Sequence, residues 1–338
     1  MSELDYPFSD APAVATGLEV VDGIHWLRLP LPFVLDHINV WLLDDGDGWT
    51  LVDTGVSKQK TRDAWEQLFS SQLQGKPIRR IIITHFHPDH FGLSKWISEH
   101  YQVAPQATLA TQERAEYMLQ TDAPAEQGPI TGFYRSHGID APMKFADFAT
   151  GQSYREIVSG LPAEMSVIND NDKMIIAGKS WRAIICNGHA QGHLSLYCEE
   201  LDLLISGDQI LPSITSNISL HGDNPDADPL RDYLQSLNVF LALPETTLVL
   251  PSHGRIFRGL HRRAAAIETH HNEKLEQTYS YCNPPRTAAE VAKLLFPQQL
   301  DELNWILAFG ESLAHLRYLE RRQEIDCSFE QDKYYFQQ

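Results

Sequence analysis

The sequence predicts a mixed α/β fold, in which helices cover a β-sheet, followed by a helical segment at the C-terminal end. One observation is the alternation of short apolar segments with turn residues and amphipathic stretches up to about residue 254. A second is that several apolar segments end in His or Asp beside Gly. The third is the change to helical periodicity beyond His253. Side chains gathered at strand ends are how open α/β sheets build sites.

Length and composition are those of a globular protein with an acidic surface. A chain of 338 residues allows two domains, or one large domain with an appendage. The apolar fraction of 43% is sufficient for a sizeable core. A formal net charge of −18 repels phosphate backbones, which disfavours nonspecific nucleic-acid binding. The composition therefore favours a small-molecule partner, and it leaves the oligomeric state open.

We expect a cytoplasmic protein with no membrane span. The sequence has no apolar run of 18 residues, and it begins with the acidic segment Met-Ser-Glu-Leu-Asp rather than a basic one. The chain has four cysteines without CxxC spacing, Cys186, Cys198, Cys282 and Cys327. This pattern indicates reduced thiols with a structural, space-filling role.

The first half of the chain is predicted to contain hairpins and then a strand–helix–strand unit. Residues 1–20 are expected to be a loose lead-in, and the cluster Asp44–Gly48 predicts a hairpin turn. The predicted strands are Ile24–Leu29, Asn39–Leu43, Thr50–Val52 and Ile78–Thr84, with a helix over Thr61–Leu73. The third of these strands ends in Asp53, which is followed by Thr54 and Gly55.

The densest cluster of metal-binding residue types is Thr84–Gly92. On an extended strand side chains alternate in direction, so His85 and His87 are expected to point the same way and to share one metal. Pro88 suits the first turn of a helix. Asp89 and His90 would lie at that turn and face a neighbouring metal position.

Residues 111–160 are less regular, and they are predicted to be a helical insertion that covers the site. Tyr134, Arg135 and His137 lie in this insertion and are candidate substrate contacts. Surface polarity without function is the alternative for these three residues.

Three more strand ends carry candidate ligands. His189 follows one strand in the turn 187–193, Asp208 follows Ser206-Gly207, and His253 lies in Pro-Ser-His-Gly. The strands predicted in this half are Met174–Ile176, Trp181–Cys186, Leu194–Cys198, Leu203–Ser206 and Leu248–Leu250.

The C-terminal part is predicted to be helical. Leu260–Tyr281 has the pattern of one long helix, and a break at Asn283-Pro284-Pro285 follows it. A second helix begins after Thr287, which has Glu290 three residues on as in a capping box. Asn304–Glu320 is another amphipathic helix. We divide the chain into a catalytic domain, 1–260, and a helical extension, 261–338.

These motifs, in this order, resemble those of the metallo-β-lactamase-fold hydrolase superfamily. The resemblance covers about residues 20–260, and it is nearest to the glyoxalase II-like branch with a C-terminal winged-helix-type extension. It implies an αββα sandwich with two metals at the sheet edge. It further implies that His85, His87 and His189 bind the first metal, that Asp89, His90 and His253 bind the second, and that Asp208 bridges both.

The resemblance also implies roles for residues around the metals. Asp53 would orient the metal-binding loop, and His193 would support the site without binding metal. His37 would lie at the mouth of the site and is a candidate substrate contact. Gln209 and Asn217, which follow Asp208, are further candidate substrate contacts.

Imidazole and carboxylate ligands suit Zn²⁺, and also Mn²⁺ or Fe²⁺. No Cys occupies a ligand position, unlike the Cys-containing pattern of true β-lactamases. Two such metals can hold a bridging hydroxide near neutral pH, and Asp89 would help to orient it. The expected reaction is hydrolysis of an ester, thioester, lactone or phosphodiester.

Other functions stay open at this point. A single-strand-specific endoribonuclease is one, although residues 261–338 hold twelve acidic against nine basic side chains. Redox chemistry is another. Diiron flavoproteins share the fold but have Glu where His87 stands, whereas a mononuclear iron dioxygenase-like enzyme would bind one metal. A noncatalytic metal-binding scaffold is the least favoured alternative.

Overall fold

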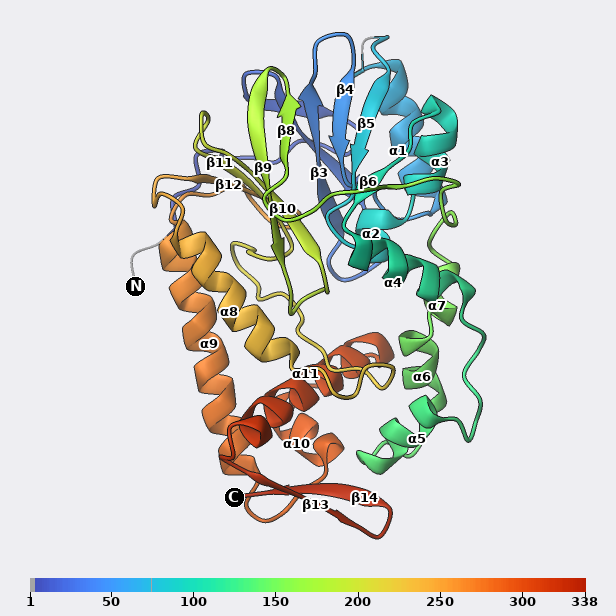
Figure 1. Cartoon of the computed structure of the whole chain (residues 1–338), viewed down its shortest axis with the longest axis vertical. Coiled ribbons are helices and arrows are strands. Elements are labelled where there is room, and N and C mark those ends of the chain that lie inside the picture. Colours follow the sequence, from blue (N-terminus) through green and yellow to red (C-terminus); the bar gives the residue numbers. More distant parts are fainter. Residues whose placement is uncertain (1–3, 74) are drawn as a thin grey trace.

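The computed structural model describes residues 4–73 and 75–338, and it contains two β-sheets packed face to face between layers of helices (Figure 1). The first sheet has seven strands in chain order, antiparallel from β1 to β4 and parallel from β4 to β7. Its strands are β1 Gly17–Val21, β2 Ile24–Pro30, β3 His37–Asp44, β4 Trp49–Val52, β5 Ile78–Ile82, β6 Gln106–Ala107 and β7 Ser166–Val167.

The second sheet has five strands in the order β12-β11-β10-β9-β8, and only β11 and β12 run parallel. Its strands are β8 Lys173–Ile176, β9 Lys179–Cys186, β10 His193–Cys198, β11 Leu203–Gly207 and β12 Leu248–Pro251. Buried side chains of both sheets form one apolar layer, including Trp26 and Trp41 from the first sheet and Trp181 and Ile205 from the second. Burial of this layer is what joins the two sheets.

Helices cover the outer face of each sheet, which confirms the predicted αββα arrangement. Trp65 and Leu68 of α1 and Ile97 of α3 pack against the first sheet. Tyr233 of α8 and Ile267 of α9 belong to the cluster on the second. The helices up to the second sheet are α1 Gln59–Ser70, α2 Pro88–Phe91, α3 Ser94–Tyr101, α4 Leu109–Gln120, α5 Pro129–Ser136, α6 Met143–Ala149 and α7 Gln152–Arg155.

The C-terminal part begins with α9, whose bounds match the prediction. Helix α8, Pro229–Leu241, lies between β11 and β12. The elements after β12 are α9 Leu260–Tyr281, α10 Ala288–Leu295, α11 Glu302–Arg321, β13 Asp326–Glu330 and β14 Lys333–Gln337. Thr287 and Glu290 form the predicted capping box at the start of α10. The apolar cluster continues from Tyr233 of α8 to Phe309 of α11, so packing is continuous across residue 260. The domain boundary and the winged-helix-type description stay predictions.

Some local expectations were wrong. Residues 17–21 are strand β1 instead of part of a loose lead-in, because they pair with β2. The residues after α11, for which no strand is predicted, form the antiparallel hairpin β13–β14. Helix α8 had no counterpart in the prediction.

All four cysteines are free, and three of them are buried. Within residues 4–73 and 75–338, no helix is long and apolar enough to cross a membrane.

Candidate metal centre

The loop after β5 carries the first histidines of the site. Strand β5 ends at Ile82, so His85 and His87 lie in a loop and not on the strand as expected. They nevertheless approach each other, with 2.9 Å between His85 Nε2 and His87 Nδ1. Pro88 begins the short helix α2, as predicted. The loop, rather than strand alternation, brings the two imidazoles together.

His189 completes a first group of three histidines. It lies in the turn between β9 and β10, and its Nε2 is 3.2 Å from His85 Nε2. Gly188 precedes it with φ of +110°, and a Cβ there would lie 2.3 Å from Tyr233 Cβ, so only glycine fits. One nitrogen from each of His85, His87 and His189 lies within 4.8 Å of the others. This spacing is suitable for one metal ion.

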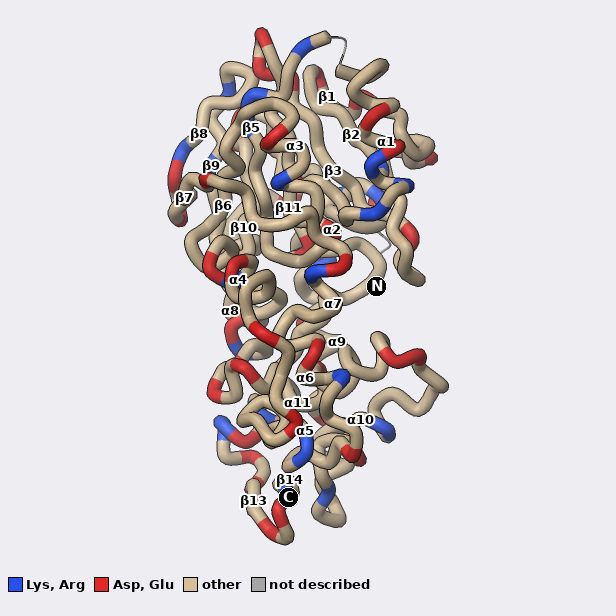
Figure 2. Tube along the Cα trace, turned by 90° about the vertical axis from the view of Figure 1, so that its right-hand side faces the viewer, with Lys and Arg blue, Asp and Glu red and all other residues tan. Residues whose placement is uncertain are grey.

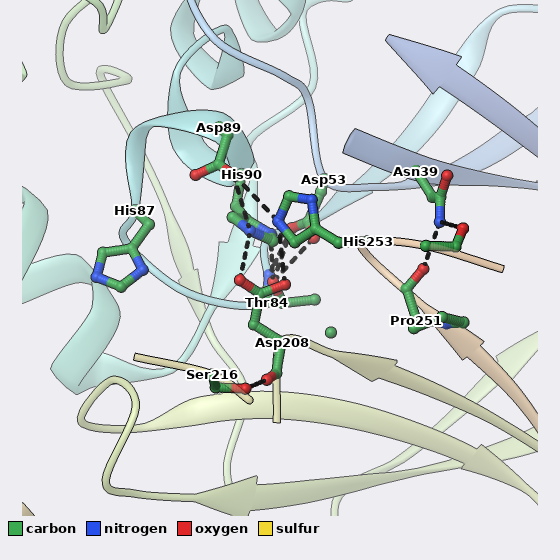
Figure 3. Close-up of polar contacts among 12 residues, drawn as sticks. Asn39, Asp53, Thr84, His87, Asp89, His90, Asp208, Ser216, Pro251 and His253 are labelled. Atoms are coloured by element: carbon green, nitrogen blue, oxygen red, sulfur yellow. Dashed lines mark hydrogen bonds and ion pairs between the residues drawn. The ribbon is translucent and has the colours of Figure 1, made fainter. Parts of the chain in front are cut away.

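A second group consists of Asp89, His90 and His253. Asp89 Oδ2 is 3.3 Å from His253 Nε2 and 3.6 Å from His90 Nε2. Asp89 and His90 come from α2, whereas His253 follows β12 (Figure 3). Their ligand atoms also lie within 4.8 Å of one another.

Asp208, at the end of β11, lies between the two groups. Its Oδ2 is 3.5 Å from His189 Nε2 and 3.4 Å from His90 Nε2. Its Oδ1 is 3.4 Å from His253 Nε2 (Figure 3). A single carboxylate therefore reaches histidines of both groups.

Asp53 supports this arrangement through Thr84 and His90. Its buried carboxylate accepts hydrogen bonds from Thr84 N at 2.8 Å and from Thr84 Oγ1, and it lies 2.8 Å from His90 Nδ1. When His90 Nδ1 carries the proton and donates to Asp53, its Nε2 lone pair is directed toward Asp89 and Asp208. The backbone of Asp53 is left-handed, with φ of +64°, a conformation that Asp tolerates better than most residues.

His253 is fixed by the first sheet. Its Nδ1 lies 2.9 Å from the carbonyl oxygen of His37, and the ring of His37 accepts a hydrogen bond from Gly254 N. The Asn39 side chain donates to the carbonyl oxygens of Pro251 and Gly254 (Figure 3). His37 therefore lies beside the site, and its role as a substrate contact stays a prediction.

His193 is buried beneath Asp208. Its Nε2 accepts a hydrogen bond from Asp208 N at 3.0 Å. Gly207 lies against the same ring, since a Cβ there would be 2.5 Å from it. His193 thus holds the backbone of the strand end in place.

Burial and mutual proximity perturb the pKa values of these groups. Burial, together with neighbouring histidines, lowers the pKa of His85 and of His87 well below the usual value. Burial alone would also lower the pKa of His253, but Asp208 and Asp89 raise it to about 10. The same carboxylates raise the pKa of His90 well above its usual value against the effect of burial.

The carboxylates respond in the opposite direction. Burial would raise the pKa of Asp89, but His90 and His253 lower it to about 2. The same two histidines hold the pKa of Asp208 well below its usual value despite burial. The site therefore keeps both carboxylates ionised and compensates for them with positive charge.

The residues present fit divalent metal ions. Several buried side-chain atoms of the described residues lack a hydrogen-bond partner, and two of them, His90 Nε2 and Asp208 Oδ1, belong to the candidate ligands. Buried polar atoms are costly when unpaired, so these two imply a ligand that the chain itself does not supply. Imidazole and carboxylate donors suit Zn²⁺, Mn²⁺ or Fe²⁺.

The expected substrate contacts in the insertion are corrected by the structure. Tyr134 is buried against Phe145 and Phe309, and His137 is buried and stacks on Tyr334. Both pack on the C-terminal part because α5 lies beside β14 (Figure 1). Arg135 is exposed on the same helix. The structure does not bring these three residues to the histidine groups.

Gln209 and Asn217 are close to the site but are engaged by the protein. Gln209 is fully buried and donates to Ser236 Oγ and to the carbonyl oxygen of Asn187. The carbonyl oxygen of Asn217 lies 2.9 Å from His189 Nδ1. Both therefore have supporting contacts in place of the expected substrate contacts.

Sequence reasoning missed several supporting residues. Thr84 bonds to Asp53, and Ser216 Oγ donates to the carbonyl oxygen of Asp208. Tyr154 Oη donates to the carbonyl oxygen of Phe86 at 2.6 Å. Thr84 could have been inferred from its place between a strand and the histidines. Tyr154 and Asn39 carry no local signal, because their partners are distant in the chain. Ser216 is close to Asp208 in the chain but lies in a loop without a recognisable motif.

The fold and this site define a metal-dependent hydrolase, and the chain belongs to the metallo-beta-lactamase superfamily. The model of that superfamily matches residues 34–253, and the model of the metallo-beta-lactamase-like C-terminal domain matches residues 275–338.

Individual relatives resemble the chain over nearly its whole length. It is 27% identical to the probable metallo-hydrolase YqjP of Bacillus subtilis, over 92% of this chain and 96% of that protein. The crystal structure of a beta-lactamase domain protein from Burkholderia ambifaria has a TM-score of 0.90 and 37% identity, covering 99% of this chain and 98% of that one. A metallo-beta-lactamase family protein from Thermus thermophilus has a TM-score of 0.81 and 27% identity, covering 95% of this chain and 100% of that one.

Proposed function

We propose that the chain is a binuclear metal-dependent hydrolase. His85, His87 and His189 would bind the first metal, and Asp89, His90 and His253 the second. The observation that carries the proposal is the position of Asp208, within 3.5 Å of His189 and within 3.4 Å of both His90 and His253. A carboxylate in that position can bridge two ions, which a single-metal site would not require.

The metals would most suitably be zinc, with manganese or iron as alternatives, since every donor is an imidazole or a carboxylate. When bound, divalent metals of this kind lower the pKa of water and polarise a carbonyl or phosphoryl oxygen. Asp89 has the most exposed carboxylate of the set, with 17% of its side chain exposed against 9% for Asp208. We assign it the orientation of the attacking water, for which its low pKa keeps it an acceptor.

A small molecule is the favoured substrate. Lys and Arg are scattered among Asp and Glu over the whole trace (Figure 2), and the net charge is −18. That field opposes the approach of a polyanion. Esters, thioesters, lactones and phosphodiesters all present an electrophilic centre that this site could attack. We include a single-stranded oligonucleotide as the test of the nuclease alternative.

The test combines metal analysis with a screen of those four substrate classes. We expect two equivalents of metal per chain and turnover that a chelator abolishes. His87→Ala and Asp208→Ala should lose metal and turnover together. His100→Ala and Asp47→Ala, at exposed positions outside the site, are the matched controls.

Two outcomes would contradict the proposal. Turnover that survives the loss of metal in His87→Ala would disprove the assignment of the site. One equivalent of iron in the wild-type chain would instead favour the mononuclear dioxygenase-like alternative.

A further inference from the structure

The loop 209–222 connects the metal centre to the C-terminal helices. It leaves β11 after Asp208 and passes between the second sheet and α11 (Figure 1). Two of its residues contact candidate ligands. Ser216 Oγ donates to the carbonyl oxygen of Asp208, and the carbonyl oxygen of Asn217 lies 2.9 Å from His189 Nδ1. The position of this loop therefore bears directly on both ligands.

Helix α11 holds the loop at Asn217. Asn217 Nδ2 donates to the carbonyl oxygen of Leu307 and to Glu311 Oε2, each at 3.3 Å. Asn217 Oδ1 accepts a hydrogen bond from Ser219 Oγ at 2.6 Å. Both polar atoms of the Asn217 side chain are therefore engaged, and its amide nitrogen donates both of its hydrogen bonds to the C-terminal part.

Gly310 allows the loop to lie directly on the helix. Leu220 N donates to the carbonyl oxygen of Gly310 at 3.0 Å. A Cβ at Gly310 would lie 2.6 Å from Ser219 Oγ and 2.7 Å from Ser219 Cβ. Glycine inside a helix costs about 1 kcal/mol relative to alanine, so its presence here requires a reason outside the helix. The close approach of the loop supplies that reason.

We infer that Asn217, Gly310 and Glu311 are positioning residues through which α11 sets the orientation of His189. This inference rests on the proposed function, because it takes His189 as a ligand of the first metal. A histidine that donates from Nδ1 to a carbonyl oxygen presents Nε2 to a metal and is fixed in that tautomer. The carbonyl here belongs to Asn217, whose position depends on α11. The C-terminal part thus acts as a support of the metal centre.

The geometry also indicates which variants are informative. Burial raises the pKa of Glu311 to about 7, against the effects of Lys274 and Asn217. Its Oε2 can accept from Asn217 Nδ2 whether the carboxyl is ionised or neutral. A glutamine can accept the same bond, whereas an alanine cannot. Gly310→Ala improves helix propensity while displacing the loop, so helix unfolding is not its expected effect.

The test is a Zn²⁺ titration of the whole chain in competition with a chelating dye. Asn217→Ala, Glu311→Ala and Gly310→Ala should weaken one of the two equivalents by about 10- to 100-fold, as is usual for groups behind a metal ligand. In Asn217→Ala and Glu311→Ala the other equivalent, held by Asp89, His90 and His253, should stay within about threefold, because neither side chain bonds to those residues or to Asp208. Gly310→Ala also displaces Ser216, which bonds to Asp208, so in that variant both equivalents are expected to weaken. Glu311→Gln should restore wild-type affinity.

Two control variants match these changes. Gly132→Ala places a Cβ in helix α5 where nothing lies within 4 Å. Glu302→Ala removes an exposed carboxylate from the start of the same helix α11. Both should bind Zn²⁺ as the wild-type chain does. Thermal unfolding of each apo variant separates a loss of folding from a loss of affinity. If Asn217→Ala does not fold, the comparison of Glu311→Ala with Glu311→Gln tests the inference instead.

The outcomes separate this inference from the proposed function. Two equivalents in the wild-type chain, with unchanged affinities in Glu311→Ala and Gly310→Ala, would overturn the inference alone. Equal weakening of both equivalents in Asn217→Ala or Glu311→Ala would also overturn it, because the effect would then be general. A single equivalent in the wild-type chain would overturn the two-metal proposal, whereas its weakening by Gly310→Ala would still support the role of α11. A wild-type chain without Zn²⁺ binding would overturn both.

Discussion

Replacing Asp53 by asparagine should weaken metal binding without unfolding the protein. The Asp53 carboxylate accepts from Thr84 N and Thr84 Oγ1 and faces His90 Nδ1 at 2.8 Å. An ionised carboxylate can only accept, so it requires the proton of neutral His90 on Nδ1. An asparagine amide can donate instead, which allows the proton to move to Nε2, the nitrogen that faces Asp89 and Asp208.

The expected loss follows from the cost of that change. Groups behind metal ligands typically contribute 10- to 100-fold in affinity, which corresponds to about 1.4–2.7 kcal/mol. Asp53→Asn keeps the size of the side chain, and Asn tolerates the left-handed backbone at φ +64°. Its stability should therefore fall less than that of Asp53→Ala.

Asp53→Ala should behave differently. It leaves two buried groups, Thr84 N and His90 Nδ1, without their partner, at about 1–3 kcal/mol each. A left-handed alanine adds about 1–2 kcal/mol. The sum, roughly 3–8 kcal/mol, is comparable with the whole stability of many domains.

The assay is a Zn²⁺ titration of each variant together with urea unfolding of the apo chain. Asp47→Asn, at an exposed side chain paired with Arg79, is the matched control and should change neither quantity. Wild-type Zn²⁺ affinity in Asp53→Asn would refute the role given to the carboxylate. An equal loss of stability in both Asp53 variants would show that the loss of Zn²⁺ affinity does not come from the position of the proton on His90.

Three further outcomes are expected. Burial and the nearby His315 lower the pKa of His271 to about 3. His271 therefore stays neutral in the folded chain, whereas in the unfolded chain it takes up a proton below about pH 6.5. Its contribution to stability is present above pH 6.5 and is lost as the pH falls toward 3. Between pH 7 and pH 5 the loss of unfolding free energy due to His271 is about 2 kcal/mol. His271→Asn keeps a donor toward His315 but cannot titrate. In urea unfolding, this variant should therefore lose about 2 kcal/mol less than the wild-type chain between the two pH values. Thr287→Ala removes the capping box of α10 and should lower the free energy of unfolding by about 1 kcal/mol, with Zn²⁺ affinity unchanged. An unchanged urea midpoint would show that the capping box does not contribute to stability. Ile205→Ala, in the layer between the sheets, should cost about 2–5 kcal/mol in unfolding free energy, whereas a cost below 1 kcal/mol would mean that the layer is loosely packed.

Local patterns were sufficient for most elements of the sandwich. The long helix Leu260–Tyr281 was predicted at its observed bounds, since its amphipathic pattern is uninterrupted and Asn283-Pro284-Pro285 follows it. Strand β1 and the hairpin β13–β14 were not predicted. Strands so short are specified by the neighbours with which they pair, and their own residues give a weak signal.

The candidate ligands are visible in the sequence because each lies beside a turn signal at a strand end. His85, His87, Asp89 and His90 are close in the chain, and His189, Asp208 and His253 each follow an apolar strand, whereas the resemblance supplied their grouping around two metals. The substrate contacts proposed in the insertion had no such signal. Tyr134 and His137 are buried by side chains of α6, α11 and β14, which no local pattern of the insertion could indicate.

The sequence by itself thus determined the mixed α/β class and the residues that gather in the site, because both depend on local periodicity and on turn residues at strand ends, whereas the αββα sandwich was implied by the family resemblance. Only the tertiary structure decided how those residues are supported. Asp53 meets Thr84 and His90, Asn39 meets Pro251, and Asn217 meets Glu311 across separations that chain order does not encode. Hydrogen bonds between distant segments depend on packing, and packing in turn places Asp208 between the two groups and α11 behind His189.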